Sequence, residues 1–132
     1  MTVPGEAKAK VQETVPLLFV SDITQSIEFY CEGLGFEMTS KWNPNGQIKW
    51  CRLQHDGASL LLQAADEEED IAKVEQAEGV TFYFVCEDAN TVHGEITARG
   101  IQATPPRVAF YDMNQTFIID PDSYELCFES PE

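Results

Sequence analysis

Hydrophobic and polar positions follow two different periods along this chain, and the change from one to the other marks the expected elements. Residues 15–20 are almost wholly apolar, which is typical of a buried strand. Asp22 then provides a helix cap, and apolar residues recur at helical spacing until Gly33 and Gly35. Asn-Gly and Asp-Gly turns separate the strands that follow the helix, which are expected at residues 36–42, 47–54 and 58–63.

The second half of the chain repeats this order. After an acidic connector over residues 66–79, residues 80–86 form another apolar run, and Asp88 caps a helix that stops at Gly100. Strand candidates then follow at residues 101–104, 108–112, 115–120 and 124–129. The halves match at a spacing of about 66 residues, which indicates an internal duplication.

Length and charge narrow the possible classes of protein. At 132 residues the chain fits one domain, expected over residues 14–132 behind a flexible lead-in at 1–13, with modules at about 14–65 and 80–130. A formal charge of −15 opposes binding to nucleic acid or to anionic membranes. The lack of a run of about 18 apolar residues, and of a basic-then-apolar secretory pattern in residues 1–12, favours a soluble, cytoplasmic protein.

Three motifs carry a resemblance to a known family. They are V-S-D leading to S-I-E-F-Y and G-L-G-F between residues 20 and 36, A-R-G-I at 98–101, and D-P-D at 120–122 before the last strand. The chain resembles the vicinal oxygen chelate superfamily, which includes glyoxalase I, bleomycin resistance proteins and extradiol dioxygenases. The likeness covers nearly all of residues 14–130.

The resemblance implies an α+β fold of two βαβββ modules that curl around a cavity, usually completed by a second subunit as a homodimer. Metal-dependent relatives carry one ligand on the first and last strand of each module. Counting from the helix caps and the terminal turn places those positions at Val15, Leu61, Thr81 and Cys127. Valine and leucine offer no lone pair, so we predict no metal and no catalytic residue. A displaced site from Gln63, Glu125 and Glu129 remains the alternative.

Strand alternation predicts which side chains face the cavity. The inner face of the first module is expected to be apolar and that of the second mixed, while the opposite faces pack beneath the helices. Aromatic residues of the middle strands and turns, including Trp42 and Phe110, could add stacking surfaces. The predicted ligand-binding residues are Phe19, Trp50, Leu61, Gln63, Tyr83, Tyr111, Glu125, Cys127 and Glu129.

Three functions fit this sequence. We favour a metal-independent binding protein with an acidic, partly aromatic pocket for a small aromatic or cationic molecule. The first alternative is an enzyme of the superfamily, either a glyoxalase-like lyase or isomerase or a dioxygenase, with a divalent metal. The second alternative is a non-catalytic interaction module.

Overall fold

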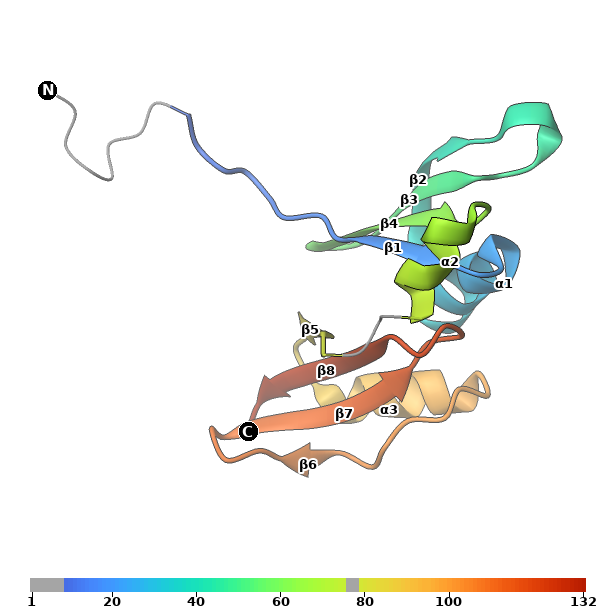
Figure 1. Ribbon diagram of the computed structural model, residues 1–132. Coiled ribbons are helices and arrows are strands. Elements are labelled where there is room, and N and C mark those ends of the chain that lie inside the picture. Colours follow the sequence, from blue (N-terminus) through green and yellow to red (C-terminus); the bar gives the residue numbers. More distant parts are fainter. Residues whose placement is uncertain (1–8, 76–78) are drawn as a thin grey trace, which may run out of the picture.

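The computed structural model describes residues 9–75 and 79–132, which form two four-stranded sheets (Figure 1). Sheet A has the strand order β1-β4-β3-β2, and sheet B has the order β5-β8-β7-β6. Each sheet belongs to one strand-helix-three-strand module, so the predicted α+β fold of two βαβββ modules is confirmed. No helix within the described ranges is long and apolar enough to cross a membrane.

Module one begins with β1, Leu17–Val20, which is followed by α1, Ile23–Glu28. The Asp22 carboxylate accepts a hydrogen bond from the Gln25 backbone N–H at 3.1 Å, as the predicted cap requires. The helix continues as a π-helical turn, Phe29–Gly33, and the chain reverses at Gly35, whose φ of +86° favours glycine. The remaining strands are β2, Glu37–Trp42, β3, Trp50–His55, and β4, Ala58–Ala64, with a short 3₁₀ turn at Pro44–Gly46.

Module two repeats this arrangement after α2, Glu68–Glu75, which occupies the acidic connector; residues 76–78 of the predicted connector lie outside the described residues. The strand β5, Thr81–Val85, leads to α3, Ala89–Ala98, whose cap Asp88 accepts from the Asn90 backbone N–H at 2.9 Å. The last strands are β6, Arg107–Val108, β7, Met113–Ile119, and β8, Glu125–Pro131.

Two predicted strands of module two are wrong. Residues 101–104 lie beside β7, where the Thr104 backbone N–H donates to the Phe117 carbonyl at 3.0 Å, but they form no strand. The two prolines that follow at 105 and 106 lack the N–H groups that a strand ladder needs. Residues 108–112 contain only the end of β6 and then a tight turn, in which Asp112 has a φ of +63°.

The core lies between the sheets and their helices. It includes Leu18, Leu62 and Tyr30 of module one and Ile96 and Leu126 of module two, each at most 2% exposed. On the helix side, Leu18, Leu62 and Leu126 are buried as predicted, while Phe82 and Phe84 of β5 are only half-buried. The opposite side of each sheet is the inner face predicted to line a cavity, and we keep that name for it.

The D-P-D turn before β8 joins the two modules. Tyr30 of module one is fully buried and its hydroxyl donates to Asp120 Oδ2 at 2.7 Å. Asp120 Oδ1 accepts from the Asp122 and Tyr124 backbone N–H groups at 2.8 and 2.9 Å. Burial raises the pKa of the Asp120 carboxyl above its ordinary value. The turn thus holds the modules together through a buried carboxylate, because its partners come from both halves of the chain.

Of the predicted flexible lead-in, residues 1–8 lie outside the described residues. Residues 9–16 form neither helix nor strand; the start of this segment extends away from the body of the molecule in Figure 1, while the Pro16 carbonyl accepts from the Leu61 backbone N–H at 2.8 Å. The Glu13 carboxylate contacts the Arg52 guanidinium of β3 at 2.6 Å. The lead-in is therefore connected to sheet A near the start of β1, and the domain boundary at residue 14 stays a prediction.

Candidate functional site

The inner face of sheet B places carboxylates, phenols and a thiol side by side. Parallel pairing of β5 with β8 and antiparallel pairing of β7 with β8 bring residues into rows that cross three strands. The central row has aromatic side chains on both sides of a cysteine. The rows are Thr81, Glu125 and Ile119; Tyr83, Cys127 and Phe117; and Val85, Glu129 and Gln115.

Glu129 is the centre of a polar network on this face. Its Oε1 atom accepts from the Tyr111 hydroxyl at 2.8 Å and from Gln115 Nε2 at 2.9 Å. The hydrogen bond to Glu129 raises the pKa of Tyr111 to about 12, because the carboxylate stabilises the protonated phenol. Glu129 is only 8% exposed and forms no ion pair among the described residues. The network therefore holds a nearly buried carboxylate with neutral donors alone. The next strand, β6, places Arg107 beside Gln115 in the same row.

Glu125 and Tyr83 extend this surface toward the other end of β8. The Thr81 hydroxyl donates to Glu125 Oε1 at 2.6 Å. The Tyr83 ring is about half exposed and meets the Phe117 ring edge-on, with centroids 6.5 Å apart. Sheet B therefore presents two carboxylates on either side of an aromatic row, which suits a ligand that is both aromatic and cationic.

The inner face of sheet A is different in chemistry. One row crosses all four strands and contains Phe19, Gln63, Trp50 and Trp42. A second row places Leu17 beside Leu61 and Arg52. Arg52 donates to the Ser59 hydroxyl at 3.2 Å as well as contacting Glu13. This face is mainly aromatic and aliphatic near β1, and its polar groups include the Gln63 amide, the Arg52 guanidinium and the Ser59 hydroxyl.

Helix α2 covers part of the sheet A face. The Lys73 ammonium lies 4.6 Å from the centroid of the Phe19 ring, and Lys49 pairs with Asp66 at 3.2 Å. Between the helix and the sheet remains a pocket of about 430 Å³. Its lining combines two tryptophans with three carboxylates, and consists of Trp42, Lys49, Trp50, Gln63, Ala64, Asp66, Glu67 and Asp70.

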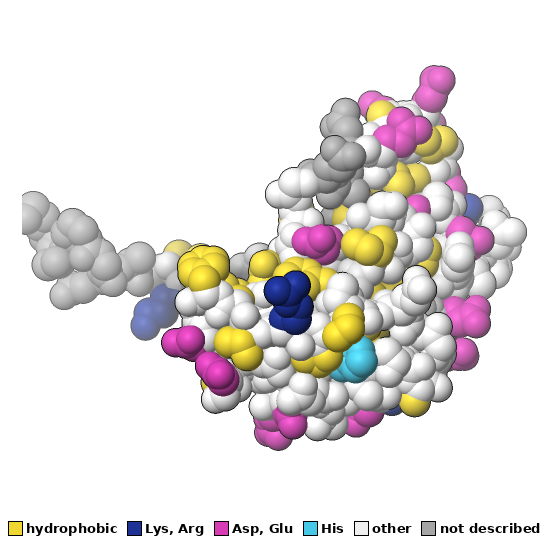
Figure 2. Space-filling view, turned by 90° about the horizontal axis from the view of Figure 1, so that it is seen from below, with side chains coloured by type: hydrophobic (Ala, Val, Ile, Leu, Met, Phe, Trp, Pro, Cys, Tyr) yellow, Lys and Arg dark blue, Asp and Glu magenta, His cyan; other side chains and the backbone are white. Residues whose placement is uncertain are grey.

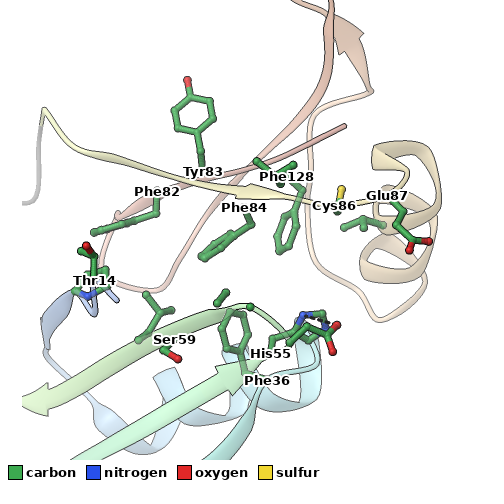
Figure 3. A pocket seen from close by; sticks show the side chains of 17 residues that line it. Thr14, Phe36, His55, Ser59, Phe82, Tyr83, Phe84, Cys86, Glu87 and Phe128 are labelled. Atoms are coloured by element: carbon green, nitrogen blue, oxygen red, sulfur yellow. Dashed lines mark ion pairs between the residues drawn. The ribbon is translucent and has the colours of Figure 1, made fainter. Parts of the chain in front are cut away.

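A larger cavity lies elsewhere, in a cleft of about 1010 Å³ between the modules (Figure 3). Phe82 and Phe84 point into it from the helix side of β5, toward Phe36 and Ser59 of module one, whereas Tyr83 points away. The centroids of Phe36 and Phe84 are 5.8 Å apart. The prediction that this side of β5 packs only beneath a helix is therefore incomplete, because the two phenylalanines also face the other module.

The residues present do not fit the metal that some relatives of this fold use. At the four expected positions stand Val15, Leu61, Thr81 and Cys127. Burial raises the pKa of the Cys127 thiol to about 12, so the thiolate that a metal would bind is disfavoured. Within residues 9–75 and 79–132, no three His, Cys, Asp or Glu residues converge as metal ligands. The alternative set is also split, since Gln63 lies on sheet A and the two glutamates on sheet B.

The structure gathers the predicted ligand-binding residues into two groups. Tyr83, Tyr111, Glu125, Cys127 and Glu129 lie together on module two, and Phe19, Trp50, Leu61 and Gln63 lie together on sheet A. Sequence reasoning missed Arg52, Gln115 and Lys73. Alternation along β3 and β7 could have found the first two, but the helix that carries Lys73 gave only a weak periodic signal.

Comparison with known proteins agrees with the fold. The family model described as Glyoxalase/Bleomycin resistance protein/Dioxygenase superfamily matches residues 11–128. Among curated proteins, no sequence matches the chain.

Three solved structures illustrate the similarity. A bleomycin resistance determinant encoded on the transposon Tn5 has a TM-score of 0.71 and 19% identity, with 92% of this chain and 99% of that chain covered. TnmS3, an antibiotic binding protein from Streptomyces sp. CB03234, has a TM-score of 0.69 and 19% identity, covering 94% and 100%. A bleomycin-binding protein from Streptomyces verticillus, complexed with copper(II)-bleomycin, has a TM-score of 0.66 and 16% identity, covering 93% and 97%.

Proposed function

Because the chain belongs to the Glyoxalase/Bleomycin resistance protein/Dioxygenase superfamily, we propose that it is a metal-independent binding protein for a small aromatic, cationic molecule. The observation that carries this proposal is the inner face of sheet B. Glu125 and Glu129 flank the ring of Tyr83 there, and neither carboxylate has an ion-pair partner among the described residues. A ligand cation would supply the missing positive charge.

The ligand would lie on residues from both inner faces. Sheet B contributes Tyr83, Tyr111, Glu125, Cys127 and Glu129 as its acidic and aromatic wall. Sheet A contributes the apolar wall, with stacking surfaces that accept flat rings. The proposed residues of sheet A are Phe19, Trp50, Leu61 and Gln63.

We propose that a second copy of the chain completes the cavity. Both β1 and β5 are edge strands with one unpaired side. Large apolar side chains of the inner faces are also exposed, Leu17 at 43%, Tyr83 at 49% and Ile119 at 55%. These features favour a homodimer in which module one of one copy faces module two of the other. The four free cysteines suit the reducing cytoplasm, where we place this protein.

Acidic side chains supply the long-range part of the attraction. The chain has a formal charge of −15, and Figure 2 shows Asp and Glu side chains spread over the face seen from below, with few Lys or Arg. A negative surface raises the local concentration of a cation and its association rate, while contacts at the site decide affinity.

Isothermal titration of the purified protein with bleomycin, in the presence of a chelator, tests this proposal. We expect saturable binding, and substitution of Glu125→Gln with Glu129→Gln should weaken it about tenfold or more, since each change removes a charge-assisted contact. Glu95→Gln on the exposed side of α3 is the control for charge alone. Absence of binding to bleomycin and to smaller aromatic cations would refute the proposal.

The homodimer is tested by light scattering. One copy has a mass of 14.8 kDa, so the proposed assembly has about twice that mass. A single-copy mass with and without bound ligand would contradict the completed cavity, even if the ligand binds.

A further inference from the structure

Helix α2 places a positive charge on an aromatic ring of the sheet A face. Lys73 Nζ lies 4.6 Å from the centroid of the Phe19 ring, well inside the range of a cation–π contact. Phe19 begins the row that continues through Gln63 and Trp50 to Trp42. The chain's own ammonium group therefore occupies one end of an aromatic row that borders the pocket beneath the helix.

The helix is held only weakly against the sheet. None of its residues is fully buried and Ile71 is 47% exposed, while Val74 is half-buried and the Asp70 side chain is 16% exposed. The Lys73 side chain is 56% exposed and also pairs with Asp70 of the same helix at 3.6 Å. A segment with so little buried surface can move away from the sheet at a small cost in free energy.

The pocket beside this contact has groups that complement a second cation, because Asp70, the ion-pair partner of Lys73, is among its lining residues. Asp66, Glu67 and Asp70 border the pocket, together with the two tryptophans. Among the residues that the structure describes, Asp66 alone of these three has an ion-pair partner across the pocket, the ammonium of Lys49. A ligand with a cationic ring would find carboxylates and aromatic surfaces here, but the ring of Phe19 is already occupied by Lys73.

We infer that Lys73 is a built-in competitor for cationic ligands, and that α2 leaves the Phe19 ring when such a ligand binds. The inference rests on the proposed function, because the inner face of sheet A that holds Phe19 is the apolar wall of the same proposed ligand site. Lys73 thereby affects which ligands bind. A cationic ligand must displace the Lys73 ammonium group before its own charge can lie on the Phe19 ring, whereas a neutral aromatic molecule gains nothing by displacing Lys73.

The test compares Lys73→Met with Lys41→Met. Lys41 pairs in register with the buried Cys51, so it lies on the helix side of sheet A and not on the inner face that holds Phe19. Its substitution therefore removes the same charge without touching the Phe19 ring. Titration with N-methylquinolinium should show about two- to fivefold tighter binding for Lys73→Met than for Lys41→Met, the range of an exposed cation–π contact. In a Phe19→Leu background this difference should vanish, because the shared ring is gone. Uncharged quinoline should bind both variants equally.

Hydrogen exchange reports the movement of the helix. Amides of residues 68–75 in the wild-type protein should exchange faster when N-methylquinolinium is bound. Equal affinities of the two methionine variants, or unchanged exchange in α2, would overturn the inference.

Failure of the proposed function gives a separate result. The chain has two tryptophans, Trp42 and Trp50, and both border the pocket under α2. Tryptophan fluorescence therefore reports on this pocket alone. If neither bleomycin nor N-methylquinolinium binds any variant, the proposed function is refuted. In that case, stronger acrylamide quenching of the tryptophan fluorescence in Lys73→Met than in Lys41→Met would still support the inference that Lys73 covers the Phe19 ring. Equal quenching in the two variants would overturn that inference.

Discussion

The two modules have the same backbone plan but different inner faces. In module one, Leu17 pairs with Leu61. The residues 66 positions further along the chain, Tyr83 and Cys127, form the equivalent pair in module two. The same spacing relates Phe19 and Gln63 to Val85 and Glu129. The mainly apolar rows of sheet A are thus matched on sheet B by one row with a phenol and a thiol and another with a carboxylate.

This difference shows where the duplicated fold is constrained. On the helix side, Leu60 and Leu126 occupy equivalent positions and are both buried, because each must fill the space beneath its sheet. On the inner side the equivalent positions hold Leu61 and Gln63 in sheet A but Cys127 and Glu129 in sheet B, the latter two at most 8% exposed, so the two inner faces share no common packing. Side chains there are free to differ, and that is where the chemistry for a ligand lies.

The two faces also differ in what covers them. Helix α2 lies on sheet A through the Lys73–Phe19 contact, while the described residues place no helix over the inner face of sheet B (Figure 1). The aromatic face of sheet A is therefore partly covered by a helix, whereas the acidic face of sheet B is bounded by its own polar network, in which Glu129 is 8% exposed.

The largest expected effect is the loss of stability when a buried leucine on the helix side of either sheet is shortened. Comparing the two sheets tests whether their helix sides are equally well packed. Leu60→Ala and Leu126→Ala should each lower the free energy of unfolding by about 2–5 kcal/mol, the cost of a buried cavity. We expect Leu126→Ala to cost more, because Leu60 also borders the cleft between the modules, where neighbours can shift into the space. Urea denaturation measures both values, and a larger cost for Leu60→Ala would contradict this difference in packing.

A smaller effect is expected at the link between the modules. Tyr30→Phe removes the hydroxyl that donates to buried Asp120 and should lower the free energy of unfolding by about 1–3 kcal/mol. Tyr124→Phe is the matched control, because its hydroxyl donates to the Phe19 carbonyl at 2.9 Å and that phenol is less deeply buried. Thermal unfolding of the two variants should therefore rank Tyr30→Phe as the more damaging, and the reverse order would show that the carboxylate link is not the stronger one.

The smallest effect concerns the phenol network that sheet A lacks. Glu129→Gln should lower the pKa of Tyr111 from about 12 toward its ordinary value of 10.0, since the neutral amide no longer stabilises the protonated phenol. The pKa is raised in the folded state, so the network contributes stability below about pH 10 and loses it as the pH rises through about 12. Ultraviolet titration, with Tyr111→Phe to identify the signal, checks this change. A pKa that stays near 12 in Glu129→Gln would assign the shift to burial instead.

Local sequence patterns predicted most of the fold. The caps at Asp22 and Asp88, the turn at Asp56, where φ is +49°, and the alternation in β4 and β8 all stand as expected. These features depend on neighbouring residues, so they can be recognised without the rest of the chain. No strand forms at residues 101–104. Pairing with a neighbouring strand needs backbone N–H groups, and the two prolines that follow this segment have none.

For the candidate site, the sequence by itself determined which side chains share an inner face, because strand alternation is a local property. Only the tertiary structure decided what each of those side chains meets. Glu129 receives two neutral donors, Tyr30 reaches Asp120 across 90 positions of sequence, and Lys73 lies on Phe19. Such contacts depend on how distant segments pack, and no local period encodes them.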